Sequence, residues 1–325
     1  MAMCTLKSVA KLFSFYDPST PAESRAQRTL RKSRIPRIRD YMIDNPKDYI
    51  FSSLTVSVGG KINFHSSSIS KSSNLGTISI SQDASILIND GQHRVAAIQK
   101  AIEEMPELGM DTISVVFFED IGLKRSQQMF SDLNKNAVKP TKSLGVLYDN
   151  RNPFSSFIVK MIKNVSIFHN LTELEKTTIS NRSKCVFTLN GISESTKIIL
   201  GKSKILTKEE QTLVTDYWNE VTKNMVDWNL LITKKVTATE LRKDYVHAST
   251  NMLQALGLAG RVLLDEFPKN WKRKLVGLSR IDWNRTNDLW EGKFVLHGKM
   301  IKNRAGIISA ANIILKECDA KRRAK

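Results

Sequence analysis

The stretch ILINDGQHRVAAI, residues 86–98, joins a short apolar run to a polar turn and then to a second apolar pattern. Three apolar residues followed by a five-residue polar turn predict a strand that leads through a loop into the N-terminus of a helix. The first turn of a helix leaves backbone N–H groups unpaired and carries the positive end of the macrodipole. This arrangement is therefore suited to bind an anion, above all a phosphate.

The polar residues of this loop suit an anion site. Gly91 allows a positive φ or a close backbone approach, and Asp90 can cap the helix or hold a metal ion or a hydroxyl group. His93 supplies a titratable donor, and Arg94 supplies a forked cation for phosphate oxygens. The same spacing also fits an ordinary capped turn with a surface His–Arg pair. The residues alone leave both interpretations open.

The loop DGQHR at 90–94, with the helix after it, resembles the defining motif of the DGQHR-domain family, whose relatives include the ParB N-terminal domain and the sulfiredoxin-like fold. The stretches FSSLT at 51–55 and FSDLNKNAVKPTKSL at 130–144 extend the resemblance to the DndB family, which regulates DNA phosphorothioate (sulfur) modification. The likeness is strongest over residues 25–150 and weaker over nearly all the rest. It implies a repressor of its own modification operon that senses modified DNA.

The resemblance also implies a nucleotide site. ParB-like proteins and sulfiredoxins place nucleotide phosphates on their equivalent of this loop, which implies ATP or CTP here, with Mg²⁺ aided by a carboxylate. The segment 134–139 is implied as the opposite wall, although taken alone it reads as an ordinary helix–loop–helix connection. The cofactor-binding residues so predicted are Asp90, Gly91, Gln92, His93, Arg94, Asn134, Asn136 and Lys139.

Enzymatic activity is left open, either as nucleotide hydrolysis or as DNA nicking. For an enzyme, the catalytic candidates are Asp90, His93 and Arg94, with His93 as the general base of a nuclease. A nuclease needs an acidic cluster for its metal ion, and the sequence displays none. There is no Walker A sequence. Sulfiredoxins carry their catalytic cysteine where this chain has Gln92, so their repair chemistry is not expected here.

The charge of the chain indicates a class of partner. The 325 residues carry a formal charge of +18 and a pI near 9.8, which favours a polyanion such as double-stranded DNA. The sequence shows neither a membrane-spanning apolar run nor a secretory h-region, so no membrane partner and a cytoplasmic location are expected. Cys4, Cys185 and Cys318 lie far apart, which fits a reducing compartment and argues against a zinc site or a disulfide framework.

Two basic segments carry much of this charge. Residues 25–39 contain seven Lys and Arg and no acidic residue, and residues 266–325 contain fifteen Lys and Arg against six Asp and Glu. Such segments are either solvated helix faces or contacts to a phosphate backbone. Of Trp271, Trp283 and Trp290 in the second segment, at least two are expected to be buried. The predicted DNA contacts are Arg25, Arg28, Arg31, Lys32, Arg34, Lys272, Arg273, Lys274 and Arg285.

Hydrophobic periodicity in the first half predicts strands and helices together. Strands are expected over 51–58 and 113–118, a hairpin over 78–88, and helices over 95–105 and 124–134. With the resemblance, these elements indicate a ParB/sulfiredoxin-like domain over residues 1–150.

The second half, residues 151–325, is expected to be a mainly helical, basic domain, so that the fold class of the whole is α+β (mixed α/β). Asn152 caps a helix with Pro153 at its first position, Thr207 with Glu210 forms a capping box, and a longer helical pattern covers 239–267. The segment 170–206 reads as a flexible connector. His247 is expected to be a packed or surface residue and not a ligand.

These observations predict a DNA-binding transcriptional repressor of a phosphorothioate modification gene cluster, modulated by a nucleotide at residues 90–94. The alternative is a ParB-like nucleotide hydrolase or a DNA-nicking enzyme. A scaffold for the modification enzymes is a third interpretation, because a basic surface also suits acidic proteins. Homo-oligomerisation stays open.

Overall fold

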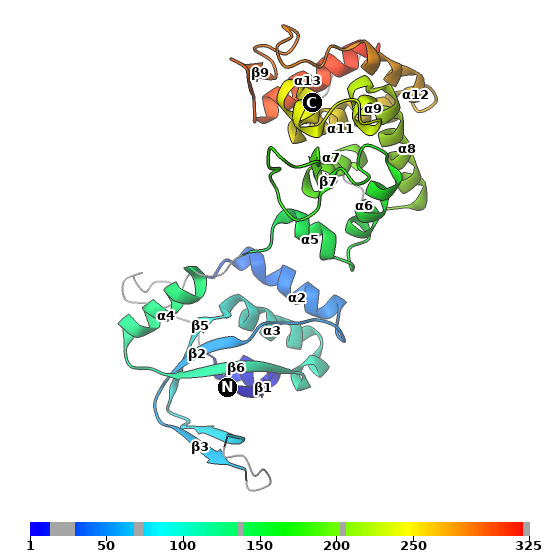
Figure 1. The fold of residues 1–325 in the computed structure, drawn as a ribbon. Coiled ribbons are helices and arrows are strands. Elements are labelled where there is room, and N and C mark those ends of the chain that lie inside the picture. Colours follow the sequence, from blue (N-terminus) through cyan, green and yellow to red (C-terminus); the bar gives the residue numbers. More distant parts are fainter. Residues whose placement is uncertain (14–29, 68–73, 136–138, 202–205, 321–325) are drawn as a thin grey trace. The chain divides into compact units, whose positions relative to one another are not determined.

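The computed structural model describes residues 1–13, 30–67, 74–135, 139–201 and 206–320. The chain separates into two compact units, Met1–Val138 (unit 1) and Lys139–Lys325 (unit 2). Helices outweigh strands, and both build the fold (Figure 1), so the predicted α+β class is confirmed. Whether residues 1–150 and 151–325 fold as independent domains stays a prediction. None of the described helices combines the length and apolarity needed to cross a bilayer.

Unit 1 is built on a four-stranded sheet of order β1-β6-β2-β5. The strands β2 and β6 run parallel, and the other neighbouring pairs are antiparallel. Alternate strand residues such as Val56 and Ile88 face three helices and form one core with them. The strands are β1 (Ala2–Thr5), β2 (Leu54–Gly59), β5 (Ser85–Asp90) and β6 (Thr112–Glu119), and the helices are α1 (Leu6–Leu12), α2 (Ile35–Asp44) and α3 (Gln92–Glu104).

The opposite face of this sheet carries buried polar side chains beside α4 (Leu123–Lys135). Asn89 on β5 donates from Nδ2 to Oγ of Ser57 on β2 at 2.6 Å, and Ser126 of α4 reaches the same Oγ at 3.4 Å. All three side chains are buried. Hydrogen bonds therefore link α4 to the strand that ends at the DGQHR loop.

A separate two-stranded ribbon of β3 (Ile62–Ser66) and β4 (Gly76–Ile80) projects from the sheet in Figure 1. The hairpin predicted over 78–88 is wrong, because β4 pairs with β3 while β5 pairs with β2. The strands themselves lie where the alternation of apolar residues places them. Alternation shows which face of a strand is apolar, but it does not identify the strand's partner.

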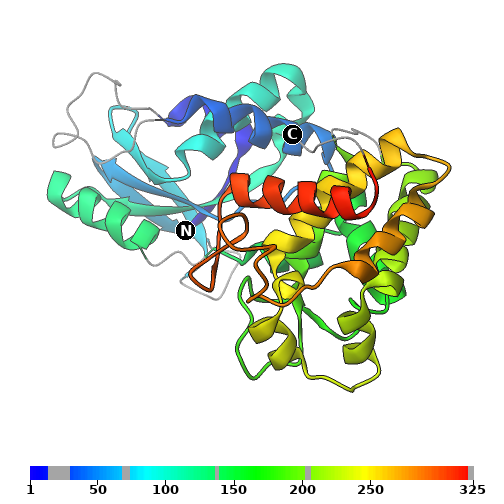
Figure 2. The same cartoon turned by 90° about the horizontal axis from the view of Figure 1, so that it is seen from above.

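Unit 2 is mainly helical, and α11 (Thr250–Glu266) packs against α7 (Leu189–Leu200) and α13 (Arg304–Glu317). Figure 2 shows α13, in red, lying beside α11. The other helices are α5 (Lys142–Tyr148), α6 (Pro153–Asn164), α8 (Lys208–Asn224), α9 (Val226–Ile232), α10 (Ala238–Asp244) and α12 (Trp271–Lys274), and the short strands are β7 (Thr172–Glu173), β8 (Phe187–Thr188), β9 (Val295–Leu296) and β10 (Lys299–Met300).

Local sequence signals in unit 2 are confirmed where they concern helix starts. The side chain of Asn152 caps α6 with Pro153 in its first turn, and Thr207 with Glu210 closes a capping box on α8. All three tryptophans of the C-terminal basic segment are buried. Two predictions are wrong. The segment 170–206 is no mere connector, because it contains α7 with a buried face, and the helical pattern over 239–267 is interrupted at Tyr245–Ser249.

That interruption places His247 in the core of unit 2, where its side chain is fully buried. The indole Nε1 of Trp228 can only donate, so Nδ1 of His247 accepts its hydrogen bond at 3.1 Å. The other ring nitrogen, Nε2, then carries the proton and donates to Oδ2 of Asp227 at 3.0 Å. Burial lowers the pKa of His247 from its ordinary value, while Asp227 opposes this change. The imidazole is neutral in the folded chain.

The neutral state of His247 predicts acid sensitivity of unit 2. Below about pH 6.5 an unfolded histidine takes up a proton that the folded one resists, so the free energy of unfolding should fall with decreasing pH, by at most about 1.4 kcal/mol per unit. All five tryptophans lie in unit 2, so their fluorescence in urea titrations between pH 5 and 8 reports this unit. His247→Gln should flatten the dependence, whereas substitution of the exposed His169 by Gln should leave it unchanged. Equal slopes in all three proteins would refute the assignment.

Candidate functional site

The DGQHR loop forms the predicted junction of strand and helix: β5 ends at Asp90 and α3 begins at Gln92. Gly91 is the N-cap of α3 and has a φ of 107°, in the left-handed region. The φ favours glycine, and a Cβ there would lie 2.3 Å from Cδ2 of the buried Leu54, so any larger residue would also force that side chain to shift. Of the roles that the sequence left open for Asp90, helix capping is excluded, because α3 has no side-chain cap and this carboxylate pairs with a cation.

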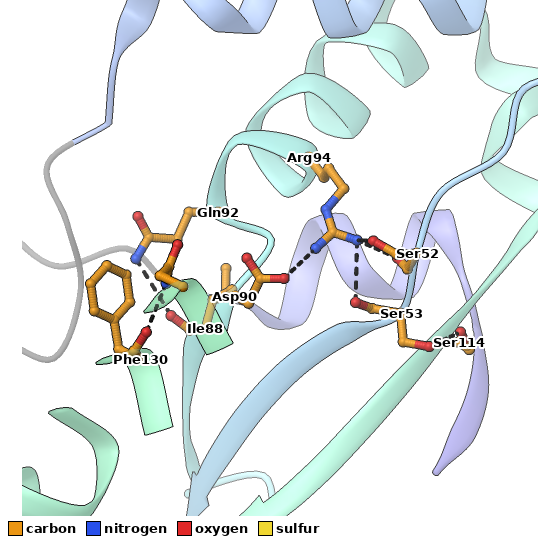
Figure 3. A network of polar contacts seen from close by, with 9 residues as sticks. Ser52, Ser53, Ile88, Asp90, Gln92, Arg94, Ser114 and Phe130 are labelled. Atoms are coloured by element: carbon orange, nitrogen blue, oxygen red, sulfur yellow. Dashed lines mark hydrogen bonds and ion pairs between the residues drawn. The ribbon is translucent and has the colours of Figure 1, made fainter. Parts of the chain in front are cut away.

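That cation is Arg94, whose side chain is only 15% exposed. Its Nη2 donates to Oδ2 of Asp90 at 2.7 Å (Figure 3). Its Nη1 donates to the backbone oxygen and to the Oγ of Ser52, the latter at 2.8 Å, and to the backbone oxygen of Ser53 at 3.2 Å. Burial lowers the pKa of Arg94 from its ordinary value, and Asp90 opposes this. Arg94 thus joins the loop to the segment that precedes β2.

The other predicted cofactor residues are placed differently. Gln92 is 5% exposed, and its amide points to the backbone oxygen of Ile88 at 3.5 Å. Asn134 is exposed on α4, where its Nδ2 donates to the backbone oxygen of Phe130 at 2.8 Å. Asn136 lies outside the described residues, and Lys139 is the first residue of unit 2.

His93 connects the loop to the first basic segment, a contact that sequence reasoning did not anticipate. Its Nε2 accepts a hydrogen bond of 2.9 Å from the backbone N–H of Arg31. Arg31 is the N-cap of a short 3-10 helix, Lys32–Arg34, which leads directly into α2. The side chains of Arg31, Lys32 and Arg34 are exposed. The structure therefore ties the segment that carries three of the predicted DNA contacts to the loop through the backbone of Arg31, while Arg25 and Arg28 lie outside the described residues.

The cations of the second basic segment are largely engaged within unit 2. Lys272 lies 3.4 Å from a carboxylate oxygen of Asp216, and Lys274 donates to the backbone oxygen of Asp319 at 2.8 Å. Arg285 donates to the backbone oxygen of Arg242 at 2.7 Å, and Arg273 is exposed.

Arg242 itself is a structural cation that the sequence did not reveal. Its guanidinium donates to the backbone oxygens of four residues in the segment 180–185, and burial lowers its pKa from the ordinary value. No local pattern marks this role, since the segment lies about sixty positions away in the chain.

Few groups of the DGQHR loop are available to bind the phosphates of a nucleotide. The cation of the motif, Arg94, is occupied by Asp90 and by backbone oxygens, and Gln92 is buried. The N-terminus of α3, His93 and the neighbouring exposed cations could still meet phosphates. Within the described residues, no group of three or more His, Cys, Asp or Glu could hold a metal ion.

Comparison with known proteins identifies the family. The DndB family, described as DNA-sulfur modification-associated, matches residues 1–320, and the chain belongs to this family. The SPbeta prophage-derived uncharacterized protein YopQ of Bacillus subtilis (strain 168) is 22% identical over 224 residues, which are 66% of this chain and 47% of YopQ. The chain thus spans about half the length of that relative. No solved structure matches the chain significantly, so the ParB-like relationship stays a prediction.

The geometry of Gly91 predicts a strong effect of a single methyl group. Gly91→Ala should destabilise unit 1 by about 1–3 kcal/mol, because it combines a disfavoured φ with a clash against Leu54. The matched control is Gly145→Ala on α5, where a Cβ meets nothing within 4 Å and alanine should be neutral or stabilising by up to about 1 kcal/mol. Hydrogen exchange of the β5 and α3 amides measures the effect of Gly91→Ala, and exchange of the α5 amides in unit 2 measures that of Gly145→Ala. Unchanged protection in Gly91→Ala would show that the loop tolerates a side chain.

Proposed function

We propose that this chain is a DNA-binding regulator of DNA sulfur modification, which contacts the phosphate backbone with the exposed cations beside the DGQHR loop. One observation carries the proposal: the hydrogen bond from the Arg31 N–H to His93 sets Arg31, Lys32 and Arg34 beside the loop. Family membership supplies the biological setting. In that setting, the DNA is the promoter of the modification gene cluster, and binding there represses transcription.

Electrostatics supports a phosphate contact at this place. Arg31, Lys32, Arg34 and Arg37 are exposed, and the sequence between them contains no acidic residue. Such a cluster is destabilised by its own repulsion unless a polyanion neutralises it, and each neutralised phosphate releases bound counterions. Contacts of this kind fix the position of a protein on DNA but do not identify a sequence.

A nucleotide at the DGQHR loop is the second candidate function. It is favoured by the N-terminus of α3, a thirteen-residue helix whose N-cap is Gly91 and which no side chain caps. An ATP or CTP phosphate there would be met by the helix dipole and by the cations next to His93. Because His93 is hydrogen-bonded to Arg31, such a ligand could bias the position of the basic segment.

The DNA contact is tested by the salt dependence of binding. In an electrophoretic shift on the upstream DNA of its own gene, the wild type should lose affinity by orders of magnitude between low and moderate salt. Lys32→Ala with Arg34→Ala should reduce the slope of log K against log salt by about 0.9 for each lost phosphate contact. The control, Lys7→Ala with Lys47→Ala, removes the same charge from exposed positions elsewhere in unit 1 and should keep the slope. If the wild type does not bind this DNA, or if its affinity does not depend on salt, the proposal is wrong.

Calorimetry with ATP and CTP tests the second candidate. The wild type should bind one of them, and His93→Ala should weaken the binding and should uncouple it from DNA affinity. His169→Ala, at an exposed histidine of unit 2, should behave as the wild type. If the wild type binds neither nucleotide, the loop has a structural role in joining α3 to the basic segment.

A further inference from the structure

The ribbon of β3 and β4 has two chemically different faces. In its antiparallel register Asn63 lies opposite Ser79, and His65 lies opposite Thr77. Side chains of paired and alternate residues share a face, so these four hydrogen-bonding residues form one surface. The contact of 2.9 Å between Nε2 of His65 and Oγ of Ser79 lies on it. The other face is formed by Ile62, Phe64, Ile78 and Ile80.

The polar face is exposed, while the base of the ribbon is anchored. All four polar residues are exposed, and neither Asn63 nor Thr77 makes a side-chain hydrogen bond with another described residue. On the opposite face Ile62 and Ile80 pack against the core of unit 1, whereas Phe64, farther along, is 51% exposed. Figure 1 shows the ribbon extending away from the four-stranded sheet.

The attachment of the ribbon is close-packed. At the crossing from β2 to β3, Gly60 has a φ of 152°, and a Cβ there would lie 2.8 Å from Cβ of Ala84. The Ser81 N–H donates to the backbone oxygen of Lys61 at 3.4 Å, which continues the pairing across the break between the ribbon and the sheet. The ribbon is therefore a bent continuation of the antiparallel pair β2–β5.

We propose that the polar face of this ribbon reads base edges in the major groove of DNA. This inference rests on the proposed function. The major groove admits a two-stranded ribbon, and its base edges present acceptors and donors that Asn, Ser and Thr side chains match, with Asn forming a bidentate pair to adenine. Residues 61–80 contain two lysines and no acidic residue, so nothing in the ribbon repels phosphates.

In this proposal the ribbon contacts the bases, and the cations beside the DGQHR loop contact the phosphates of the same duplex. The ribbon continues from the start of β5, and the DGQHR loop follows the end of β5. Asp90 lies opposite Thr55, and Asn63 follows Thr55 by eight residues. Eight extended residues span at most about 27 Å, less than one helical turn of B-DNA, so the two surfaces can meet one duplex. The cations hold phosphates and the neutral ribbon face identifies the sequence, which is the separation of affinity from specificity seen in DNA-binding proteins.

The test separates these two roles. A preferred duplex is first selected from random DNA with the full-length wild type, and binding to it is compared with binding to a scrambled duplex at several salt concentrations. For Asn63→Ala with Thr77→Ala, the preference for the selected duplex should fall about tenfold or more, with the salt slope unchanged. The control, Asn150→Ala at an exposed position of unit 2, should keep the preference. Methylation of guanine N7, an atom of the major groove, should interfere with wild-type binding and less with the double variant.

The outcomes distinguish the inference from the proposed function. If the wild type does not bind DNA, the proposed function fails and the ribbon's role fails with it. If the wild type binds with an undiminished salt slope but the double variant keeps its full preference, the ribbon is not the reader and the proposed function stands. Equal loss on both duplexes with a smaller slope would make the ribbon a phosphate contact and would also overturn the inference. Circular dichroism of the double variant checks that the exposed substitutions leave the fold intact.

Discussion

The guanidinium of Arg94 is the interaction on which the arrangement of the DGQHR loop depends. It satisfies the backbone oxygens of Ser52 and Ser53 just before β2, and the carboxylate of Asp90 at the end of β5. Oxygens left without a donor in a partly buried place cost free energy, and a fork with several N–H groups is the one side chain that can meet them together. The contact therefore fixes two neighbouring strands and the start of α3 relative to each other.

Because Arg94 binds groups of the protein itself, the chemistry expected of the DGQHR motif changes. A forked cation next to a helix start suits phosphate, and its sequence spacing is the same whether it binds a ligand or the protein itself. Here Asp90 and Arg94 neutralise each other, so the motif adds little net charge. In the proposed function the charge for a polyanion comes instead from the exposed Arg31, Lys32 and Arg34, whose segment is held to the loop by the hydrogen bond from the Arg31 N–H to His93. The motif positions a basic surface that belongs to a different part of the chain.

Local signals in the sequence were sufficient to predict much of the fold. The strand–loop–helix at 86–98, the glycine with positive φ and the capped starts of α6 and α8 each depend on residues within a few positions. What could not be predicted depends on contacts between distant positions. No periodic pattern in the sequence indicates three such features. They are the pairing of β5 with β2 instead of β4, the buried helix α7 within a polar stretch, and the contact of Arg31 with His93 across 62 positions. The cations of unit 2 illustrate the same limit, since Arg285 and Arg242 serve backbone oxygens and composition alone cannot separate them from phosphate ligands.

The contact between Arg31 and His93 also gives the proposed function a physical basis for coupling. Nε2 of His93 accepts the Arg31 N–H, and so it carries no proton itself. A phosphate oxygen is likewise an acceptor, so a phosphate that takes this N–H must displace the imidazole. An anion at the basic segment and a ligand at the DGQHR loop would thus compete for, or share, the same few donors. Under the proposed function, binding at one place would alter affinity at the other.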